Sequence, residues 1–529
     1  MAIIQDFFSE LNRDEVRYMH FKSNTDLKRN FDGIGDFDVL VSDEDYEHLE
    51  SILTQFGARR FETIKEKRYP YVCSWLLYDS VSGKLYHIHL HRRLMSGKEY
   101  VKDYIIPWHD FLLNTRIFDS IWNIYITEPN VELILLATRT VIKSKSHDLR
   151  NAKNGKYQLP DKLNKIRQVL QKKMNIDKLK YYCELLFPNQ DCTSIIDFGL
   201  DKEIDSELFL KLSNLIRNSL KKDRRMSPLS AEIKFRIHSF SYKVKRHLTR
   251  KYDASIITKK VLENHRGLIV ALVGVDGAGK STTVKVLKNW LGSQIDSKSY
   301  YMGDGSGETG RFVALLKRIL GIKVTSATNI SKYVPGEIYG ASVQRRTRLV
   351  RKIRRKLKSM FLTPKIRTIL RALIIVLVQQ RNQRLLKKMV RYRNKGGISI
   401  TDRYPQMESP GMNDGLKVET YLEKYPSSIV LKLFQQLEKK YLRKSVQIKP
   451  DVVFRLNISI QTSMERKPEQ KNIEVYKQKI DKLQDITFNN SYIIDINAEQ
   501  PYDEELLLLK RNIWTLLTKH KDAKQSVLL

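Results

Sequence analysis

A glycine-rich segment near the middle of the chain has the residue types and spacing of a phosphate-binding loop. Residues 274–282 read GVDGAGKST, which satisfies the pattern G-x-x-x-x-G-K-[ST]. The backbone N–H groups of such a loop surround phosphate oxygens, and the helix that follows adds partial positive charge at its first turn. The sequence therefore predicts a nucleoside triphosphate site, with ATP and Mg²⁺ as the cofactors.

Two side chains of this loop have expected roles in catalysis. Lys280 is expected to reach the β and γ phosphates, and Ser281 to bind Mg²⁺. A glycine-rich turn without a ligand is the alternative, but a buried-strand run at 268–273 precedes the loop and a helical stretch at 283–291 follows it, which is the context of a true phosphate-binding loop. The residues predicted to contact the cofactor are Gly274, Asp276, Gly277, Ala278, Gly279, Lys280, Ser281 and Thr282.

A second motif lies about 120 residues downstream, where the strand-like run 398–400 leads into TDRY at 401–404. Together with the aspartate inside the phosphate-binding loop, this motif resembles the thymidylate kinase family of P-loop nucleoside monophosphate kinases. The resemblance implies that Asp402 serves the metal and phosphate site. It also implies that Arg403 contacts the phosphate of an acceptor.

The same resemblance assigns further residues to catalysis and to the acceptor. Asp276 and Arg381 are expected near the acceptor. Arg466 and Lys467 are expected at the start of a helix after the strand-like run 450–457, in a lid that excludes water from the transferring phosphoryl group. A solvated, charged helix start is the alternative interpretation of that pair.

The resemblance covers about residues 266–520, half of the chain, and it departs from the family at one place. Where thymidylate kinases carry an Arg-Glu-Pro or Arg-Phe-Pro element, residues 303–311 form a second glycine-rich segment. Because a fold and its ATP site can persist while the acceptor pocket changes, the expected acceptor is a nucleotide or a related small phosphorylated molecule.

Acidic and histidine side chains in the N-terminal part predict a second site. Asp36 and Asp38 alternate along a strand-like run, so both face one side and could share a metal ion. His87, His89 and His91 alternate in the same way. The segment resembles the nucleotidyltransferase-like domains of the DNA polymerase beta superfamily, in which a third acid stands where this chain has His89. Asp36, Asp38 and His89 are thus the candidate metal ligands, with a degenerate binding module as the alternative.

Local patterns predict an α/β protein with three parts. Residues 1–128 mix strand-like and helical runs, which indicates a small nucleotidyltransferase-like α/β domain. Residues 129–265 are helical at nearly every point and predict a connector. Residues 266–529 alternate helices with strands, as a parallel α/β sheet does.

The chain carries a large positive charge that bears on its partners. It has 95 Lys and Arg against 59 Asp and Glu, a formal net charge of +36. This excess favours an anionic partner, although charge spread over solvated faces is an equal alternative. The basic segment 345–358 has the pattern of an amphipathic helix that binds nucleic acid or an anionic membrane. The rivals to a kinase are therefore an ATP-binding module that uses this charge, and a bifunctional nucleotidyltransferase and kinase in glycopolymer assembly.

The sequence also predicts where in the cell the protein is located. The N-terminus lacks the charge and apolar run of a signal peptide, and the apolar run 369–378 is about half the ~20 residues that a membrane-spanning helix needs, so a buried helix is expected there. The three cysteines show no zinc or disulfide spacing. A cytoplasmic protein is expected, with attachment to the inner face of the membrane as a variant.

Overall fold

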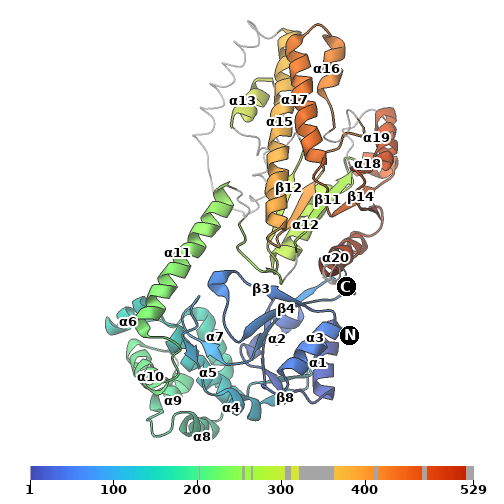
Figure 1. Cartoon of the computed structure of the whole chain (residues 1–529). Coiled ribbons are helices and arrows are strands. Elements are labelled where there is room, and N and C mark those ends of the chain that lie inside the picture. Colours follow the sequence, from blue (N-terminus) through green and yellow to red (C-terminus); the bar gives the residue numbers. More distant parts are fainter. Residues whose placement is uncertain are drawn as a thin grey trace, which may run out of the picture. The chain divides into compact units, whose positions relative to one another are not determined.

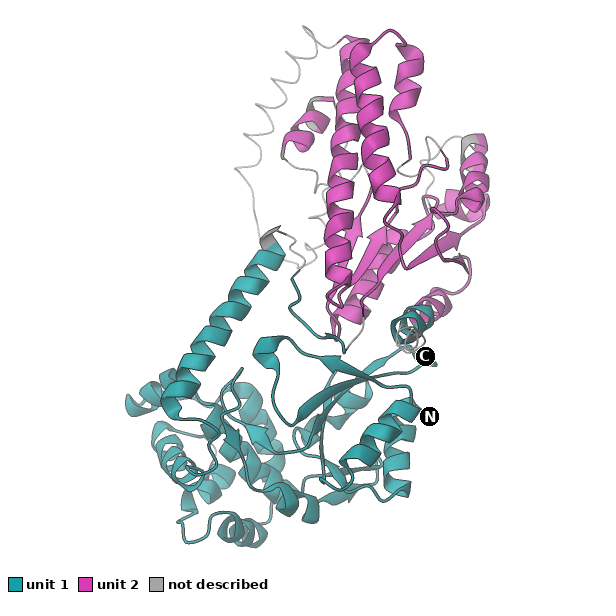
Figure 2. Ribbon diagram, viewed as in Figure 1, with its two compact units in different colours: residues 1–265, 511–529 teal, residues 266–510 magenta. Residues whose placement is uncertain are grey.

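The computed structural model describes residues 2–201, 203–252, 256–263, 266–303, 311–320, 363–409, 415–466 and 473–519. Its contacts divide the chain into two units, which are unit 1, residues 1–265 with 511–529, and unit 2, residues 266–510 (Figures 1 and 2). The predicted basic helix at 345–358 lies outside the described residues. In the described part of the chain, none of the helices is both long and apolar enough to cross a membrane.

The described part of unit 2 contains a five-stranded sheet in which every pairing is parallel. The predicted α/β fold is confirmed. In spatial order the strands are β12 (Ser297–Tyr301), β13 (Ile398–Asp402), β11 (Ile269–Gly274), β14 (Val452–Asn457) and β15 (Ile493–Asn497). The helices are α12 (Lys280–Gly292), α13 (Arg311–Leu320), α15 (Pro364–Arg393), α16 (Val418–Lys424), α17 (Ile429–Val446), α18 (Ile460–Arg466), α19 (Ile473–Asp485) and α20 (Tyr502–Lys519), the last of which contributes residues to both units.

The strand order brings the two predicted motifs together. All six residues of β11 are buried, as expected for a central parallel strand. The next strand along the chain, β12, lies on one side of β11 beyond β13, whereas β14 lies on the other side, so the direction of winding changes at β11. Ligands of open α/β sheets bind at such a point, beyond the carboxyl ends of the strands. There Leu272 of β11 is in register with Asp402 of β13.

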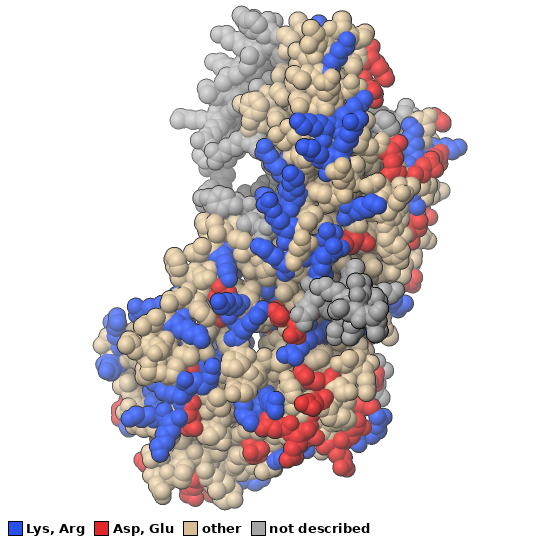
Figure 3. All heavy atoms as spheres, viewed as in Figure 1, with Lys and Arg blue, Asp and Glu red and all other residues tan. Residues whose placement is uncertain are grey.

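The apolar run 369–378 lies within the long helix α15, and the prediction of a buried helix is confirmed. Thr363 caps the helix by accepting a hydrogen bond from the Ile366 amide at 3.3 Å, and Pro364 occupies its first position, where a missing N–H costs nothing. Ala372 and Val378 are buried. Lys and Arg side chains gather on the exposed face over this helix (Figure 3).

The described part of unit 1 contains an eight-stranded mixed sheet. Its order is β10 (Val261–Leu262), β3 (Arg59–Glu62), β4 (Val72–Tyr78), β5 (Leu85–His91), β2 (Asp36–Val41), β1 (Tyr18–His20), β9 (Ile124–Ile126) and β8 (Ile117–Asp119). The helices include α1 (Ile3–Arg13), α2 (Leu27–Phe31), α3 (Tyr46–Gln55), α4 (His109–Asn114), α5 (Pro129–Lys143), α6 (Ser146–Lys153), α7 (Asp161–Gln171), α8 (Ile176–Leu186), α9 (Thr193–Leu200), α10 (Ser206–Ser219) and α11 (Pro228–Tyr252).

Helix α5 joins the helical segment to the sheet of unit 1. Glu128 caps it by accepting hydrogen bonds from the amides of Asn130 and Val131. Leu133 of α5 belongs to a hydrophobic core that also contains Met19 of β1. Residues 129–265 thus share a core with residues 1–128 in the structure. The division at residue 128 into two domains stays a prediction about folding units.

Candidate active site

The loop at 274–282 connects β11 to α12, and glycines allow its path. Gly277 has φ +94° and Gly279 has φ +83°, a region that other residues rarely adopt. A Cβ on Gly277 would also lie 3.0 Å from Oγ of Ser463. Lys280 begins α12 and is buried, and its ammonium donates a hydrogen bond to the Val275 carbonyl at 2.7 Å. The loop therefore curls around the lysine that is predicted to meet the phosphates.

Asp402 lies at the end of β13 and is joined to this loop. The Ser281 hydroxyl donates a hydrogen bond to Asp402 Oδ2. The other carboxylate oxygen, Oδ1, is buried and has no hydrogen-bond partner in the described structure. A buried carboxylate oxygen without a partner is costly unless a cation compensates it. Together with a hydroxyl oxygen, this is the oxygen-rich donor set that Mg²⁺ prefers. The residues present fit the predicted metal ion.

Arg403 follows immediately and has an unusual backbone. Its φ of +73° is disfavoured for any residue with a Cβ. The Arg403 amide donates a hydrogen bond to the Leu272 carbonyl at 2.9 Å, and its guanidinium donates to Asp276 Oδ1 at 3.1 Å. Backbone strain of this kind persists where the surroundings fix it, and such positions cluster at functional sites. The sheet thus turns this arginine toward the phosphate-binding loop.

The strain at Arg403 can be measured with two substitutions. Arg403→Gly and Arg403→Ala both remove the guanidinium, but only glycine adopts φ +73° without steric cost. The glycine variant should therefore have a free energy of unfolding about 1 kcal/mol higher than the alanine variant. Urea unfolding of both variants provides the comparison. A more stable alanine variant would show that the left-handed conformation is absent in solution.

The structure places the two remaining arginines at the edges of this site. Arg381 of α15 donates to the Tyr301 carbonyl at the end of β12, at 2.7 Å. Arg466 contacts the loop, because its guanidinium lies 3.4 Å from the Gly277 carbonyl and 3.2 Å from that of Ala498. Lys467 lies outside the described residues.

The predicted position of Arg466 at a helix start was wrong. Arg466 is the last residue of α18. The helix begins at Ile460 because the Ser459 hydroxyl accepts a hydrogen bond from the Thr462 amide at 3.2 Å, which is a helix N-cap. Ser459, a residue type that is common at helix N-caps, is the sequence signal for this helix start.

Other residues at the loop were not predicted. Ser463 of α18 donates to the Asp276 carbonyl at 2.7 Å. Thr283, which is fully buried, contacts Glu505 of α20 at 3.3 Å. Burial raises the pKa of Glu505, although the hydrogen bond from Thr283 opposes this. Neither Ser463 nor Glu505 stands in a recognisable motif, because both come from elements far along the chain that only the fold brings to the loop.

The acidic and histidine residues of unit 1 meet on two neighbouring strands. Parallel pairing of β2 with β5 sets Asp36 opposite His87 and Asp38 opposite His89. His87 Nδ1 lies 2.6 Å from Asp36 Oδ1. His89 Nδ1 and His91 Nε2 each lie 3.3 Å from Asp38 Oδ1. Two groups of potential ligand atoms result, one around each aspartate, and His89 belongs to both.

We call Asp36, Asp38, His87, His89 and His91 the acid–histidine cluster. Two lysines that were not predicted from the sequence lie beside it. The Lys22 ammonium is 2.5 Å from Asp38 Oδ1, and the Lys260 ammonium is 2.9 Å from His87 Nδ1. Burial raises the pKa of Asp38, but Lys22 and the histidines outweigh burial and hold that pKa well below its ordinary value. Ammonium groups thus provide the positive charge that a metal ion would otherwise provide.

The acid–histidine cluster predicts that the stability of unit 1 depends on pH. Burial lowers the pKa of His91 from 6.5 to about 4. Between these values the unfolded chain binds a proton at His91 that the folded chain does not bind, so stability is full above the unfolded pKa and is lost as the pH falls. His91 alone should cost about 2 kcal/mol between about pH 7 and about pH 5.

The substitution His91→Asn should reduce this dependence on pH. Urea unfolding followed by tryptophan fluorescence at the two pH values measures the difference in free energy. His247→Asn, at an exposed position on α11, provides the control and should show the same change in the free energy of unfolding between the two pH values as the unchanged protein. If His91→Asn also showed that same change, His91 would not be a source of the pH dependence.

No known protein-family profile matches this sequence. A search of curated proteins found similarity to two proteins of Escherichia coli. The "Uncharacterized ATP-binding protein YghS" of strain K12 is 28% identical over 258 residues, which cover 47% of this chain and 94% of that protein. The "Uncharacterized ATP-binding protein YghR" of the same strain is 26% identical over 241 residues, which cover 45% of this chain and 83% of that protein. This chain is therefore similar, over slightly less than half of its length, to proteins named for ATP binding.

Proposed function

We propose that unit 2 binds ATP with Mg²⁺ and transfers the γ-phosphoryl group to a nucleotide or another small phosphorylated acceptor. The observation that carries this proposal is the pair of contacts between the loop and the end of β13. Ser281 is hydrogen-bonded to Asp402, and Asp276 is hydrogen-bonded to Arg403. The names of the Escherichia coli relatives support ATP as the nucleotide.

Each residue of the site would have its own role in such a transfer. The Lys280 ammonium would neutralise charge on the β and γ phosphates. Ser281 and Asp402 would hold Mg²⁺, which when bound polarises phosphate oxygens and neutralises their charge. Arg403 would orient the acceptor. In the reaction, an acceptor oxygen forms a bond to the γ phosphorus, the bond to the β–γ bridging oxygen breaks, and ADP leaves.

The arginines at the edges would complete the site. Arg381 lies at the end of β12, next to the strand that carries Asp402, where it would contact the acceptor. Arg466 contacts the loop carbonyl of Gly277, where it would shield the phosphoryl group from water. Water that reached this group would hydrolyse ATP without a product.

Transfer of labelled γ-phosphate from ATP tests the proposal. The full-length protein with Mg²⁺ would be offered nucleoside monophosphates, sugar phosphates, unphosphorylated sugars and short nucleic acids as separate acceptors. We expect a labelled product from a small phosphorylated acceptor. Binding of ATP without any labelled acceptor would instead support an ATP-binding module.

Nucleotidyl transfer by unit 1 has less support from its geometry. Two metal ions held by carboxylates carry that chemistry in the superfamily that the segment resembles. Here His89 stands in the place of the third acid, and the Lys22 ammonium lies against Asp38. A divalent ion at Asp38 would have to displace this ammonium.

A further inference from the structure

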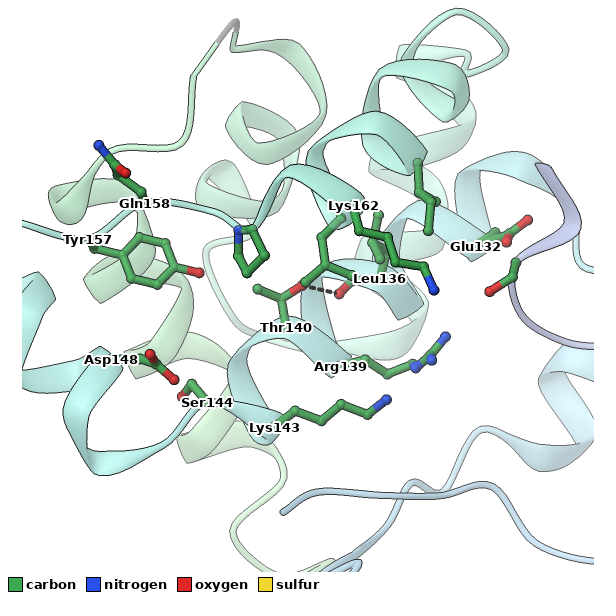
Figure 4. Close-up of a pocket in the computed structure, with 14 residues that line it drawn as sticks. Glu132, Leu136, Arg139, Thr140, Lys143, Ser144, Asp148, Tyr157, Gln158 and Lys162 are labelled. Carbon is green, nitrogen blue, oxygen red and sulfur yellow. Dashed lines mark hydrogen bonds between the residues drawn. The ribbon is translucent and has the colours of Figure 1, made fainter. Parts of the chain in front are cut away.

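A cavity in unit 1 lies between α5 and α7 (Figure 4). It shares no lining residue with the acid–histidine cluster, but its Arg139 is close enough to interact electrostatically with Asp38. Its volume of about 350 Å³ falls within the range of about 300–1,000 Å³ that is typical of small-molecule sites. Most of its lining residues are charged or polar, and four are apolar. The lining residues are Ser23, Glu132, Leu136, Arg139, Thr140, Lys143, Ser144, Asp148, Tyr157, Gln158, Pro160, Lys162, Leu163 and Ile166.

Three basic side chains line the wall of this cavity. Arg139 and Lys143 are four residues apart on α5 and therefore lie on one face of the helix, and Lys162 comes from α7. In Figure 4 the charged ends of these three side chains point to the same side of α5. Among the described residues, none of the three forms a side-chain hydrogen bond or an ion pair within 4.0 Å. Asp38 and Glu132 act on Arg139 only from beyond ion-pair distance. Repulsion by Arg139, together with burial, lowers the pKa of Lys143 to about 5, so the basic groups repel one another in the absence of an anion.

The two acids in the wall do not balance this charge. Asp148 accepts a hydrogen bond from the Lys145 amide and so caps α6. Glu132 accepts two hydrogen bonds from Asn24, and burial raises its pKa, which favours its neutral form. Like charges held close together repel each other unless an anion lies between them. Three basic side chains that converge on a hollow and have no direct acidic partner are thus the arrangement of an anion site.

Neutral polar groups line the rest of the wall. The hydroxyls of Thr140 and Ser144 each donate a hydrogen bond to a carbonyl of α5, and Ser144 also accepts one from Arg217 at 2.9 Å. Because a hydroxyl oxygen has two lone pairs, both can still accept from a ligand. Tyr157 is held by stacking on Phe209, with ring centroids 3.8 Å apart. Its hydroxyl points toward Thr140 (Figure 4), and Gln158 also contributes to the lining. Such groups bind the hydroxyls of a ligand and fix its orientation.

We propose that this cavity binds a small phosphate monoester that carries hydroxyl groups, such as a sugar phosphate. The guanidinium of Arg139 presents a planar fork that matches phosphate oxygens, and Lys162 adds a point charge. Lys143 gains its proton when the bound phosphate offsets the repulsion from Arg139. The hydroxyls of the ligand meet Thr140, Ser144 and the polar groups around Tyr157. Unit 1 is then a ligand-binding module whose ligand is distinct from the ATP of unit 2.

Isothermal titration calorimetry of the full-length protein tests this assignment. All proteins carry Lys280→Ala, so that the phosphate-binding loop of unit 2 contributes little. The ligands are inorganic phosphate, glucose 6-phosphate and glucose. The cavity variant is Arg139→Gln with Lys143→Gln. The control is Lys178→Gln with Lys180→Gln, which removes the same charge from exposed positions of α8.

Glucose 6-phosphate should bind, and glucose should not. The cavity variant should bind the ester at least about tenfold more weakly, because it loses two charge-assisted contacts, whereas the control variant should match its parent. Lys143→Gln alone, at an exposed side chain, should show part of the loss in a chain with an unchanged melting temperature. The proposal would be overturned if the cavity variant and the control bound glucose 6-phosphate with equal affinity. It would also be overturned if neither inorganic phosphate nor glucose 6-phosphate showed saturable binding.

Discussion

Replacing Lys280 with alanine should lower the rate of γ-phosphoryl transfer by a factor on the order of 100 or more. The side chain is buried at the first residue of α12, inside the curve of the phosphate-binding loop. It is the cation placed to neutralise the β and γ phosphates, whose negative charge shifts during transfer. The measurement is the rate of ADP release at saturating Mg²⁺ and acceptor, together with the affinity for ATP.

Lys285→Ala is the matched control for this prediction. Lys285 lies on the same helix but is exposed, so its removal takes away one charge without touching the loop. It should leave the rate within about twofold of the unchanged protein, since single exposed charges contribute little. If the two variants had the same rate, Lys280 would have no part in transfer, and the proposed use of the loop would be wrong.

Asp402→Asn should raise the concentration of Mg²⁺ that gives half-maximal activity by at least about tenfold, and should lower the maximal rate as well. Asparagine keeps the shape of the side chain and still accepts a hydrogen bond from Ser281. It removes the negative charge, and with it the carboxylate oxygen that is buried without a protein partner. The loss therefore reports on the metal ion, separately from the fold.

Asp485→Asn serves as the control, because Asp485 is an exposed acid at the end of α19 in the same unit. It should change neither the Mg²⁺ dependence nor the maximal rate. A second test follows the melting temperature of both variants with ATP, with and without Mg²⁺. Stabilisation by Mg²⁺ that is the same in Asp402→Asn as in the control would count against a metal role for Asp402.

Much of unit 2 was predictable from local sequence, for a physical reason. A central parallel strand is buried on both faces, so β11 reads as an uninterrupted apolar run. The loop after it needs glycines at left-handed positions such as Gly277 and Gly279. Both requirements act within a few residues along the chain, and both restrict the residue types that can occur there.

The pairing of distant residues was less predictable. Asp36 and Asp38 carried a signal because alternation along one strand places them on one face. Lys22 and Lys260 carried none, because their places beside Asp38 and His87 depend on the order of strands in the sheet. The cavity cations Arg139 and Lys143 are likewise two among many basic residues until the packing of α5 against α7 leaves them facing a hollow.

Helix α20 has a consequence for how the chain can be divided. Its residues up to 510 belong to unit 2, whereas those from 511 onward belong to unit 1, where Trp514 lies 5.6 Å from Tyr78 between ring centroids. The backbone therefore passes from one unit to the other twice. If the protein were cut once, after residue 265, the first fragment would lack Trp514, the aromatic neighbour of Tyr78. The second fragment would end in residues from 511 onward, which belong to unit 1. Separate production of the two halves requires that residues 511–519 be supplied to the first, for example through a circular permutation.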